Sequence, residues 1–326
     1  MPDSVENLVS AIIPVYNRGD LLREAVGSVL AQTHRPIEII IVDDGSTDDT
    51  TAVCAELATA HPDVIRSVRQ ENGGPGLARE TGRQLARGEF IQYLDSDDLL
   101  APQKFEKQIE ALRLRPDCGV AYCKAREYNI GELPRDEPLA RTGEDLLTLF
   151  PSLLSGPCWQ TSTPLYRRTL CDQVGPWTDL GQEEDWEYDA RVGALGTRLV
   201  WCREFLADYR HHTGFRARGN SMGNPRKMRW RYRSHVLIYQ HARRAGVDSA
   251  NPHMQRYARE LLILSRQCRA TQLEDEARTL FNLSREASGT ARSRRINFGF
   301  YRLVTASLRW NAPRAIARWI DRVRSR

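Results

Sequence analysis

Gly88-Glu-Phe-Ile-Gln-Tyr-Leu-Asp-Ser-Asp-Asp-Leu99 joins an apolar run directly to three carboxylates. The apolar and aromatic residues predict a β-strand, so Asp95, Asp97 and Asp98 should emerge at its C-terminal end. Ligands of open α/β sheets bind at that edge. Like charges repel one another there unless a cation lies among them or one carboxyl group is protonated or paired, and Mg²⁺ or Mn²⁺ is the simplest such cation. The alternative is a plain turn with an Asp helix cap before Pro102.

Strand and helix patterns alternate on the N-terminal side of this stretch. Strands are predicted at residues 8–14, 37–42 and 64–68, and helices at about 20–30, at 48–60 and from the glycine turn at 72–76 to residue 86. The strand at 37–42 is apolar almost throughout, which is typical of a strand buried on both faces of a parallel sheet. The order predicts right-handed crossovers and a three-layer α/β sandwich with a mostly parallel central sheet.

Composition narrows the class of protein. A chain of 326 residues that is 41% hydrophobic has room for one large or two modest domains. Its net charge of +5 is a small excess of 47 basic over 42 acidic residues, which does not indicate a nucleic-acid polycation. Seven scattered cysteines without a C-x-x-C pair favour reduced thiols. With no leader pattern and no apolar run near the roughly 20 residues of a bilayer span, a cytoplasmic protein is expected.

The glycines do not complete the common phosphate-binding fingerprints. A G-x-G-x-x-G pattern that begins at Gly74 meets Arg79 where its third glycine belongs, and no G-x-x-x-x-G-K-[ST] is present. The D-x-D-x-[TV] pattern of aspartyl-phosphate phosphatases fails at Leu99. What remains is a pair of acidic strand ends, at 43–44 and 95–98, on either side of a glycine turn that carries an arginine. Acids suit ribose hydroxyls and base N–H groups, and a cation suits phosphates, so the pattern favours a sugar nucleotide as ligand.

Four segments resemble a known family. They are Ala11-Ile-Ile-Pro-Val-Tyr-Asn17, Ile41-Val-Asp-Asp-Gly-Ser-Thr-Asp48, Asn72-Gly-Gly-Pro-Gly-Leu-Ala-Arg79 and Tyr93-Leu-Asp-Ser-Asp-Asp98. In this order and spacing they are similar to the successive motifs of family 2 glycosyltransferases of the GT-A fold, and the resemblance covers roughly residues 8–215. The family inverts the anomeric centre, so an inverting enzyme with a nucleotide-sugar donor, a UDP-sugar above all, is what the resemblance implies.

The resemblance also implies a donor site. Its donor-binding residues would be Pro14, Tyr16, Asn17, Asp43, Asp44, Arg79, Asp95 and Ser96. Among them Pro14, Tyr16 and Asp44 would line the nucleobase and ribose, and Asp95 and Asp97 would be the D-x-D that holds Mn²⁺ or Mg²⁺ on the diphosphate. Three members have structural alternatives, because Asn17 suits a helix cap, Tyr16 a core position and Asp43 the brace of a turn.

The middle third of the chain contains the residues that would contact the sugar acceptor. Trp159 either stacks on an acceptor sugar or belongs to the core. The run Glu183-Glu184-Asp185 opens an amphipathic helix and resembles the family's E-D motif, in which the Asp accepts the acceptor's proton; the extra Glu183 blurs the register, and Asp185 is favoured over Glu184 as the base. The segment at 206–212 resembles one in which a His is a further metal ligand, and His212 fits it better than His211. The alternative is a packed or surface histidine.

The last hundred residues carry no motif of chemistry. Three amphipathic helices are predicted at 226–245, 252–269 and 273–287, which suggests a helical extension over 221–326 after a GT-A domain at 1–220. From Arg292 the chain is rich in Arg interleaved with Trp and Phe, which is typical of a helix on an anionic membrane surface. The alternative is an ordinary packed helix. No nucleic-acid-binding signature is present.

The sequence as a whole predicts an inverting, metal-dependent glycosyltransferase that acts on a glycan, a lipid-linked molecule or another hydroxyl acceptor. Bacterial surface polysaccharide or glycoconjugate synthesis, on the inner face of the cell membrane, is the expected setting. A sugar nucleotidyltransferase is the alternative enzyme, but residues 14–20 lack the Gly-rich basic triphosphate loop that it needs. A non-catalytic nucleotide-sugar-binding protein is the other alternative, and the intact Asp95, Asp97 and Asp185 argue against it.

Overall fold

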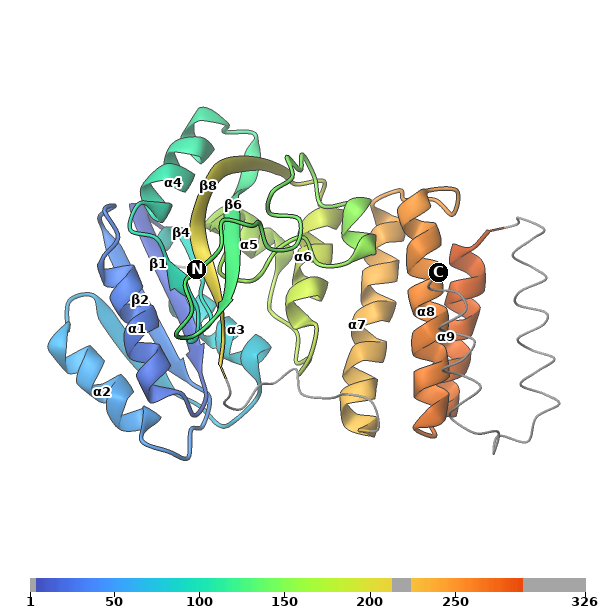
Figure 1. The fold of residues 1–326 in the computed structure, drawn as a ribbon, viewed down its shortest axis with the longest axis horizontal. Coiled ribbons are helices and arrows are strands. Elements are labelled where there is room, and N and C mark those ends of the chain that lie inside the picture. Colours follow the sequence, from blue (N-terminus) through green and yellow to red (C-terminus); the bar gives the residue numbers. More distant parts are fainter. Residues whose placement is uncertain (1–3, 213–223, 290–326) are drawn as a thin grey trace.

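A computed structural model describes residues 4–212 and 224–289, and within them one eight-stranded sheet carries helices on both faces (Figure 1). The strands are β1 (Val5–Val15), β2 (Ile37–Asp43), β3 (Ile65–Arg69), β4 (Gly88–Tyr93), β5 (Leu99–Leu100), β6 (Cys118–Asn129), β7 (Leu165–Arg167) and β8 (Arg198–His211). Their spatial order is β3-β2-β1-β4-β7-β6-β8-β5. All neighbouring pairs are parallel except those made by the short strands β5 and β7. The predicted mostly parallel sheet is confirmed.

The apolar strands are continuous because both of their faces are covered. In β2, Ile39 and Ile41 belong to one hydrophobic cluster, and Ile40 and Val42 to another on the opposite face. The first cluster is completed by α1 (Gly19–Leu30), α2 (Thr50–Ala60) and α4 (Lys104–Leu114). The second includes residues of α3 (Pro75–Leu85), α5 (Arg168–Val174) and α6 (Glu184–Ala194). This is the predicted three-layer sandwich.

Three further helices pack beside α6. They are α7 (Pro225–Arg244), α8 (Pro252–Ala270) and α9 (Glu274–Ala287), which lie at the right of Figure 1 and begin and end within one or two residues of the predicted positions. Their apolar residues belong to the same hydrophobic cluster as Trp186 of α6 and Tyr93 of β4. The packing is therefore continuous across residue 220, where the sequence suggested a domain boundary.

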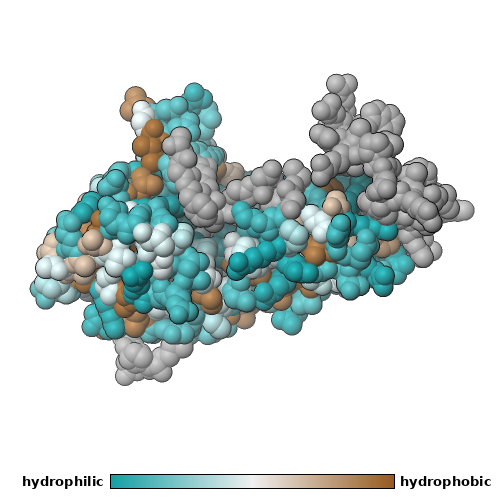
Figure 2. All heavy atoms as spheres, turned by 90° about the horizontal axis from the view of Figure 1, so that it is seen from below, coloured by the Kyte–Doolittle hydropathy of each residue, from teal (hydrophilic) through white to brown (hydrophobic). Residues whose placement is uncertain are grey.

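The surface seen from below in Figure 2 is mostly hydrophilic over the atoms that are coloured there. The apolar sides of the helices are accordingly turned inward. No helix within 4–212 and 224–289 is long and apolar enough to cross a membrane. The basic segment that starts at Arg292 lies outside the described residues.

Candidate functional site

The C-terminal end of β4 places three aspartates in three different environments. Asp98 is fully buried, and its carboxylate accepts hydrogen bonds from Ser162 Oγ at 2.9 Å and from the backbone N–H of Arg210 at 3.2 Å. Burial raises the pKa of Asp98 well above its ordinary value, and the nearby charges of Asp97 and Asp95 add to this effect. Asp98 is therefore held inside the protein, whereas Asp97 and Asp95 are partly exposed and meet arginine side chains.

Asp97 lies between two basic side chains that come from distant parts of the chain. Its Oδ2 atom is 2.7 Å from Nη1 of Arg18, which follows β1, and 3.0 Å from Nε2 of His212, which follows β8. Asp97 and His212, which were both predicted as metal ligands, are thus adjacent, whereas His211 pairs with Glu127. Arg18 was not among the predicted site residues. The available signal was its position directly after the first motif, at the end of a strand that neighbours β4.

Arg79 connects the aspartates to the start of α6. Its Nη2 atom is 2.6 Å from Oδ1 of Asp95, and its Nη1 atom is 2.8 Å from Oε1 of Glu184. Its side chain is only 3% exposed, and its guanidinium carbon lies 4.9 Å from the ring centre of Trp177. Burial would lower the pKa of Arg79, but the charges of Asp95 and Glu184 outweigh burial and raise it. Arg79 is therefore a fixed cation shared by the two acidic groups of the site.

The donor set for a metal is partly assembled. Among the residues that the structure describes, no three His, Cys, Asp or Glu side chains are grouped so that they could hold a metal ion. The carboxylate of Asp97 and the imidazole of His212 are adjacent, and oxygen and imidazole nitrogen are donors that Mn²⁺ accepts. Asp95 is turned toward Arg79. Each of these two half-buried aspartates thus already lies beside an arginine, whose positive charge offsets that of the carboxylate as a bound cation would.

The two acids after β2 shape the turns that surround the site. Asp44 accepts hydrogen bonds from the backbone N–H groups of Gly73 at 2.9 Å and Gly74 at 2.8 Å, and from Gln70 Nε2 at 2.8 Å. Burial raises the pKa of Asp44, and these hydrogen bonds act in the opposite direction. Asp43 accepts from Ser46 N at 2.8 Å and from the hydroxyl of Thr51 at 2.6 Å. Asp43 thus braces its own turn, as the structural alternative predicted.

The remaining predicted donor residues lie around the same edge of the sheet. Pro14 pairs with Val42 one position before the end of the β1–β2 ladder and is buried, Tyr16 is half-buried, and Ser96 is buried beside the aspartates. Asn17 has a positive φ of 54° and accepts a hydrogen bond from the backbone N–H of Thr47 at 2.8 Å. It ties the loop after β1 to the loop after β2. The helix-cap alternative for Asn17 does not hold, because the residue before α1 is Arg18.

The three acids at the start of α6 each have a different environment. The Glu183 carboxylate meets Arg231 of α7, with Oε1 at 2.9 Å from Nε. Glu184 is buried against Arg79, and burial together with the charge of Asp185 raises its pKa. Asp185 is half-buried, and its Oδ1 atom accepts the N–H of Trp186 at 2.8 Å. Glu183 and Glu184 are thus held by arginines from two different helices, α7 and α3.

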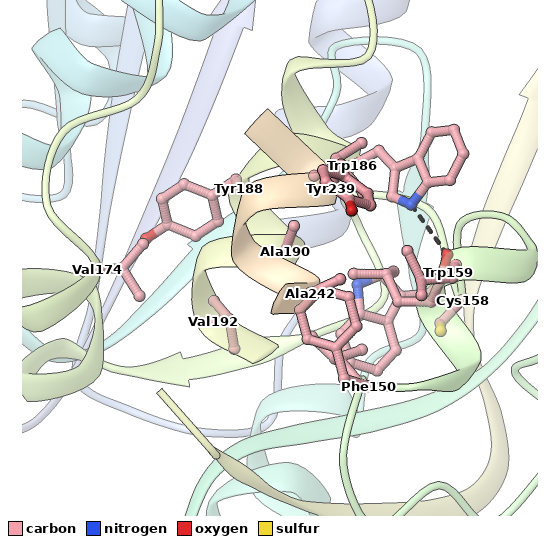
Figure 3. Close-up of a cluster of buried hydrophobic side chains, with 14 of the residues drawn as sticks. Phe150, Cys158, Trp159, Val174, Trp186, Tyr188, Ala190, Val192, Tyr239 and Ala242 are labelled. Atoms are coloured by element: carbon pink, nitrogen blue, oxygen red, sulfur yellow. Dashed lines mark hydrogen bonds between the residues drawn. The ribbon is translucent and has the colours of Figure 1, made fainter. Parts of the chain in front are cut away.

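The acceptor interpretation of Trp159 is wrong. Its side chain is 3% exposed, and its ring centre is 5.2 Å from that of Tyr122. Figure 3 shows it inside the buried cluster, together with Phe150 and with Ala242 of α7. Its faces are covered by protein, so the core alternative is the one that the structure supports. An aromatic residue has the same appearance in sequence whether it packs or lines a cleft, which is why the two alternatives could not be separated.

Comparisons with known proteins agree with this geometry. Residues 10–174 match the model of glycosyl transferase family 2. The chain is 36% identical over 205 residues to an uncharacterised glycosyltransferase of Nostoc, with 61% of this chain and 60% of that protein covered. It is 40% identical over 142 residues to the glycosyltransferase GlyG of Streptococcus pneumoniae, covering 43% of this chain and 46% of GlyG. The chain thus spans about half the length of the curated relatives it matches.

Solved structures share the fold. The S. aureus TarS 1–349 structure in complex with UDP-GlcNAc aligns with a TM-score of 0.61 and 18% identity, covering 86% of this chain and 88% of that one. The mannosyltransferase PcManGT from Pyrobaculum calidifontis, in complex with GDP-Man and Mn²⁺, aligns with a TM-score of 0.54 and 20% identity, covering 91% and 80%. Because the family model covers half of the chain, and the motif residues it spans meet at one edge of this fold, the chain belongs to glycosyltransferase family 2, with the GT-A fold.

Proposed function

We propose that the protein transfers a sugar, with inversion at the anomeric carbon, from a nucleotide-sugar donor to a hydroxyl group of a glycan or lipid-linked acceptor. One observation carries the proposal: Arg79 joins Asp95 of the D-x-D segment to Glu184 at the start of α6. This connection brings the donor-phosphate side of the site next to the candidate base. The UDP-GlcNAc and GDP-Man complexes of TarS and PcManGT support a nucleotide-sugar donor.

Asp185 is the proposed base. Glu183 and Glu184 are each held by an arginine, and Glu184 is also buried, so neither is placed to accept a proton from an incoming hydroxyl. Asp185 is half-buried on the first turn of α6. Its carboxylate would remove the proton from the acceptor hydroxyl as the oxygen attacks the anomeric carbon, and the bond to the leaving diphosphate oxygen would break on the opposite side.

Donor recognition is assigned to the loops at the same edge. Pro14, Tyr16 and Asn17 would line the nucleobase and ribose, with Asp44 holding the 72–76 turn in place beside them. Asp95, Asp97 and His212 would hold Mn²⁺ or Mg²⁺, because their carboxylate and imidazole groups are suitable donors. When bound, the cation would offset negative charge on the leaving nucleoside diphosphate. Arg18 and Arg79 add positive charge around the same aspartates.

The test is the substitution Asp185→Asn. Wild-type protein is incubated with UDP-GlcNAc, UDP-glucose or GDP-mannose, with Mn²⁺ and a panel of p-nitrophenyl glycosides as acceptors, and nucleoside diphosphate release and glycoside extension are measured. The variant should lose transfer by about 10² to 10⁴-fold, the usual effect of removing a general base. Its donor affinity should stay near that of wild type, because other residues bind the donor.

Substitutions of the two neighbouring acids show which of the three acids is the base. Glu183→Gln should lose far less transfer than Asp185→Asn, and Glu184→Gln should mainly weaken donor binding, because Glu184 pairs with Arg79. Full transfer in Asp185→Asn would show that the base lies elsewhere. Pyrophosphate formation from a nucleoside triphosphate and a sugar phosphate would favour a nucleotidyltransferase instead, and donor binding without any turnover would favour a binding protein.

A further inference from the structure

Glu183 stands at the start of α6 and has no part in the proposed transfer reaction, yet several contacts hold it in place. Its φ angle of 58° lies in the left-handed region, which costs free energy for a residue with a side chain. Such a conformation persists where the surroundings hold it. Glu183 is the residue immediately before α6 and stands two positions before Asp185. The direction in which the first turn of α6 leaves the preceding loop is therefore set at Glu183.

The contacts that hold Glu183 come from α7. Its Oε1 atom is 2.9 Å from Nε of Arg231, and its backbone carbonyl accepts a hydrogen bond from the hydroxyl of Ser234 at 3.1 Å. Its Oε2 atom lies 3.4 Å from Nε2 of His235. Burial acts to raise the pKa of Glu183, but His235 and Arg231 outweigh it and hold that pKa below its ordinary value. α7 thus holds Glu183 at two points, its ionised side chain and its backbone carbonyl. We call these contacts with Arg231 and Ser234 the clamp.

The clamp is itself supported by α8. Nη1 of Arg231 donates to Oε1 of Gln267 at 3.2 Å. The His235 ring stacks on Tyr257 with ring centres 5.5 Å apart, and the Tyr257 hydroxyl donates to the backbone carbonyl of His235 at 2.9 Å. Trp186, the residue after Asp185, packs edge-to-face with both rings, with its ring centre 5.1 Å from that of His235 and 6.1 Å from that of Tyr257. The side chain of Glu183, two positions before the proposed base, and that of Trp186, directly after it, therefore both contact the C-terminal helices.

The loop before Glu183 rests on α7 as well. A methyl group placed on Gly181 would come within 2.7 Å of the Trp230 ring, so the backbone there lies flat against that ring. Figure 3 shows α6 and α7 packed together, with Ala190 on the side of α6 that faces Tyr239 and Ala242, whereas Tyr188 points away from α7 toward Val174. From the other side, α3 contacts this entry through Arg79, which pairs with Glu184.

We propose that Glu183 is a positioning residue that, through its clamp by Arg231 and Ser234 of α7, aims Asp185 at the acceptor hydroxyl, so that α7 and α8 are working parts of the active site. This inference rests on the proposed role of Asp185. Since a displacement of about 1 Å in a catalytic group can cost 10²-fold in rate, loosening the clamp should lower turnover without touching the donor site.

The test uses the full chain and the Arg231→Met substitution. With the donor that wild-type protein cleaves among UDP-GlcNAc, UDP-glucose and GDP-mannose, and p-nitrophenyl glycosides as acceptors, kcat for transfer should fall about 10- to 100-fold. The donor KM and the donor affinity measured by calorimetry should stay near wild type. Arg231→Lys keeps the charge and should recover part of the loss. Arg233→Met is the matched control, since Arg233 stands on the same helix and pairs with exposed Asp179 at 2.7 Å, and it should leave kcat unchanged.

A double-substitution cycle separates positioning from general support. If Arg231 acts through Asp185, then Arg231→Met should have no further effect on the residual transfer of Asp185→Asn. An equal fold-loss in both backgrounds would overturn the inference, as would a parallel fall in donor affinity. Should Arg231→Met fail to fold, Ser234→Ala removes only the hydrogen bond to the Glu183 carbonyl and is tested in the same cycle. If Asp185→Asn alone keeps full transfer, the proposed base fails and this inference fails with it, whereas an additive cycle overturns the inference only.

Discussion

At the scale of single residues, aspartates that are close in sequence differ in burial and therefore in what they can bind. Asp98 is fully buried and is held by Ser162 and Arg210, whereas the side chains of Asp97 and Asp95 are 15% and 30% exposed and meet arginines. A fully buried carboxyl group with a raised pKa is a poor metal ligand, because the metal needs the ionised form. Position within the motif is therefore a guide to function only after the exposure of each member is known.

Asp98 belongs to a buried polar chain that reaches a fully buried lysine. Ser162 accepts a hydrogen bond at its carbonyl from Gln92 Nε2 at 3.1 Å, and the Nζ atom of Lys104 donates to Oε1 of both Gln92 and Gln108. No carboxylate within hydrogen-bonding distance of Nζ is present in the described part of the chain. Burial lowers the pKa of Lys104 from 10.5 to about 8. The lysine amine is thus stabilised by amide oxygens rather than by a countercharge.

This lysine predicts a specific pH dependence of stability. Between about 8 and 10.5 the unfolded chain keeps the proton on Lys104 and the folded chain has lost it, so the free energy of unfolding should rise with pH in this window. Relative to Lys104→Met, the wild-type protein should gain about 2 kcal/mol between about pH 7.5 and about pH 10. Urea unfolding of both proteins at each pH measures the difference, in which titrations common to both cancel. A difference that does not change with pH would contradict the prediction.

At the scale of elements, the glycine turn at 72–76 connects Asp44, at the end of β2, to α3, which carries Arg79. Asp44 holds the backbone of Gly73 and Gly74, and α3 then begins at Pro75 and carries Arg79 on its first turns. A methyl group on Gly76 would run into the carbonyl oxygen of Thr178 and would lie 3.5 Å from Cγ of Glu184. The absence of a side chain at Gly76 therefore allows α3 to lie against the segment that leads into α6.

Gly76→Ala should push α3 away from that segment. We expect a loss of about 1–3 kcal/mol in the free energy of unfolding, the usual cost of overpacking, together with weaker donor binding because Arg79 moves with α3. Gly27→Ala in α1 is the control. A methyl group there meets no atom within 4 Å, so it should stabilise by about 0.5–1 kcal/mol through helix propensity. Chemical denaturation and donor titration of both variants test the pair; equal effects would rule out the close contact as the cause.

The elements that could be predicted from sequence are those with a local signal. Continuous apolar runs that end in acids mark β2 and β4, and helical spacing marks α7, α8 and α9 to within two residues. The partners of the acids could not be predicted. Arg18 is 79 positions from Asp97 and Arg231 is 48 from Glu183, and no local pattern links residues so far apart. The extension of β6 to Asn129 likewise depends on pairing with β8, which begins 69 positions later.

At the scale of the whole molecule, the sheet has two cores that differ in extent. The cluster on the α1, α2 and α4 face is confined to the sandwich. The other continues from the sheet through α6 into α7, α8 and α9 without interruption. The predicted division into 1–220 and 221–326 rests on where the motifs end, and it stays a prediction. If the second core is shared, the C-terminal helices and the sandwich should lose their structure together.

The substitution Leu261→Ala in α8 tests this shared core. Leu261 is fully buried and belongs to the cluster that also contains Tyr93 and Trp186. Removing its side chain should lower the free energy of unfolding by about 2–5 kcal/mol, and because the core is continuous, the whole protein should still unfold in one transition. The opening free energy measured by amide hydrogen exchange should then fall by the same amount in β2, which is distant from the C-terminal helices in the fold, as in α8. Leu22→Ala in the other core is the comparison, and it should likewise lower the opening free energy of β2 and α8 by equal amounts.

If Leu261→Ala accelerates exchange only in α7, α8 and α9 and leaves β2 protected, the prediction is wrong. The helices would then unfold as a separate unit, and the clamp on Glu183 could open while the sandwich stays folded.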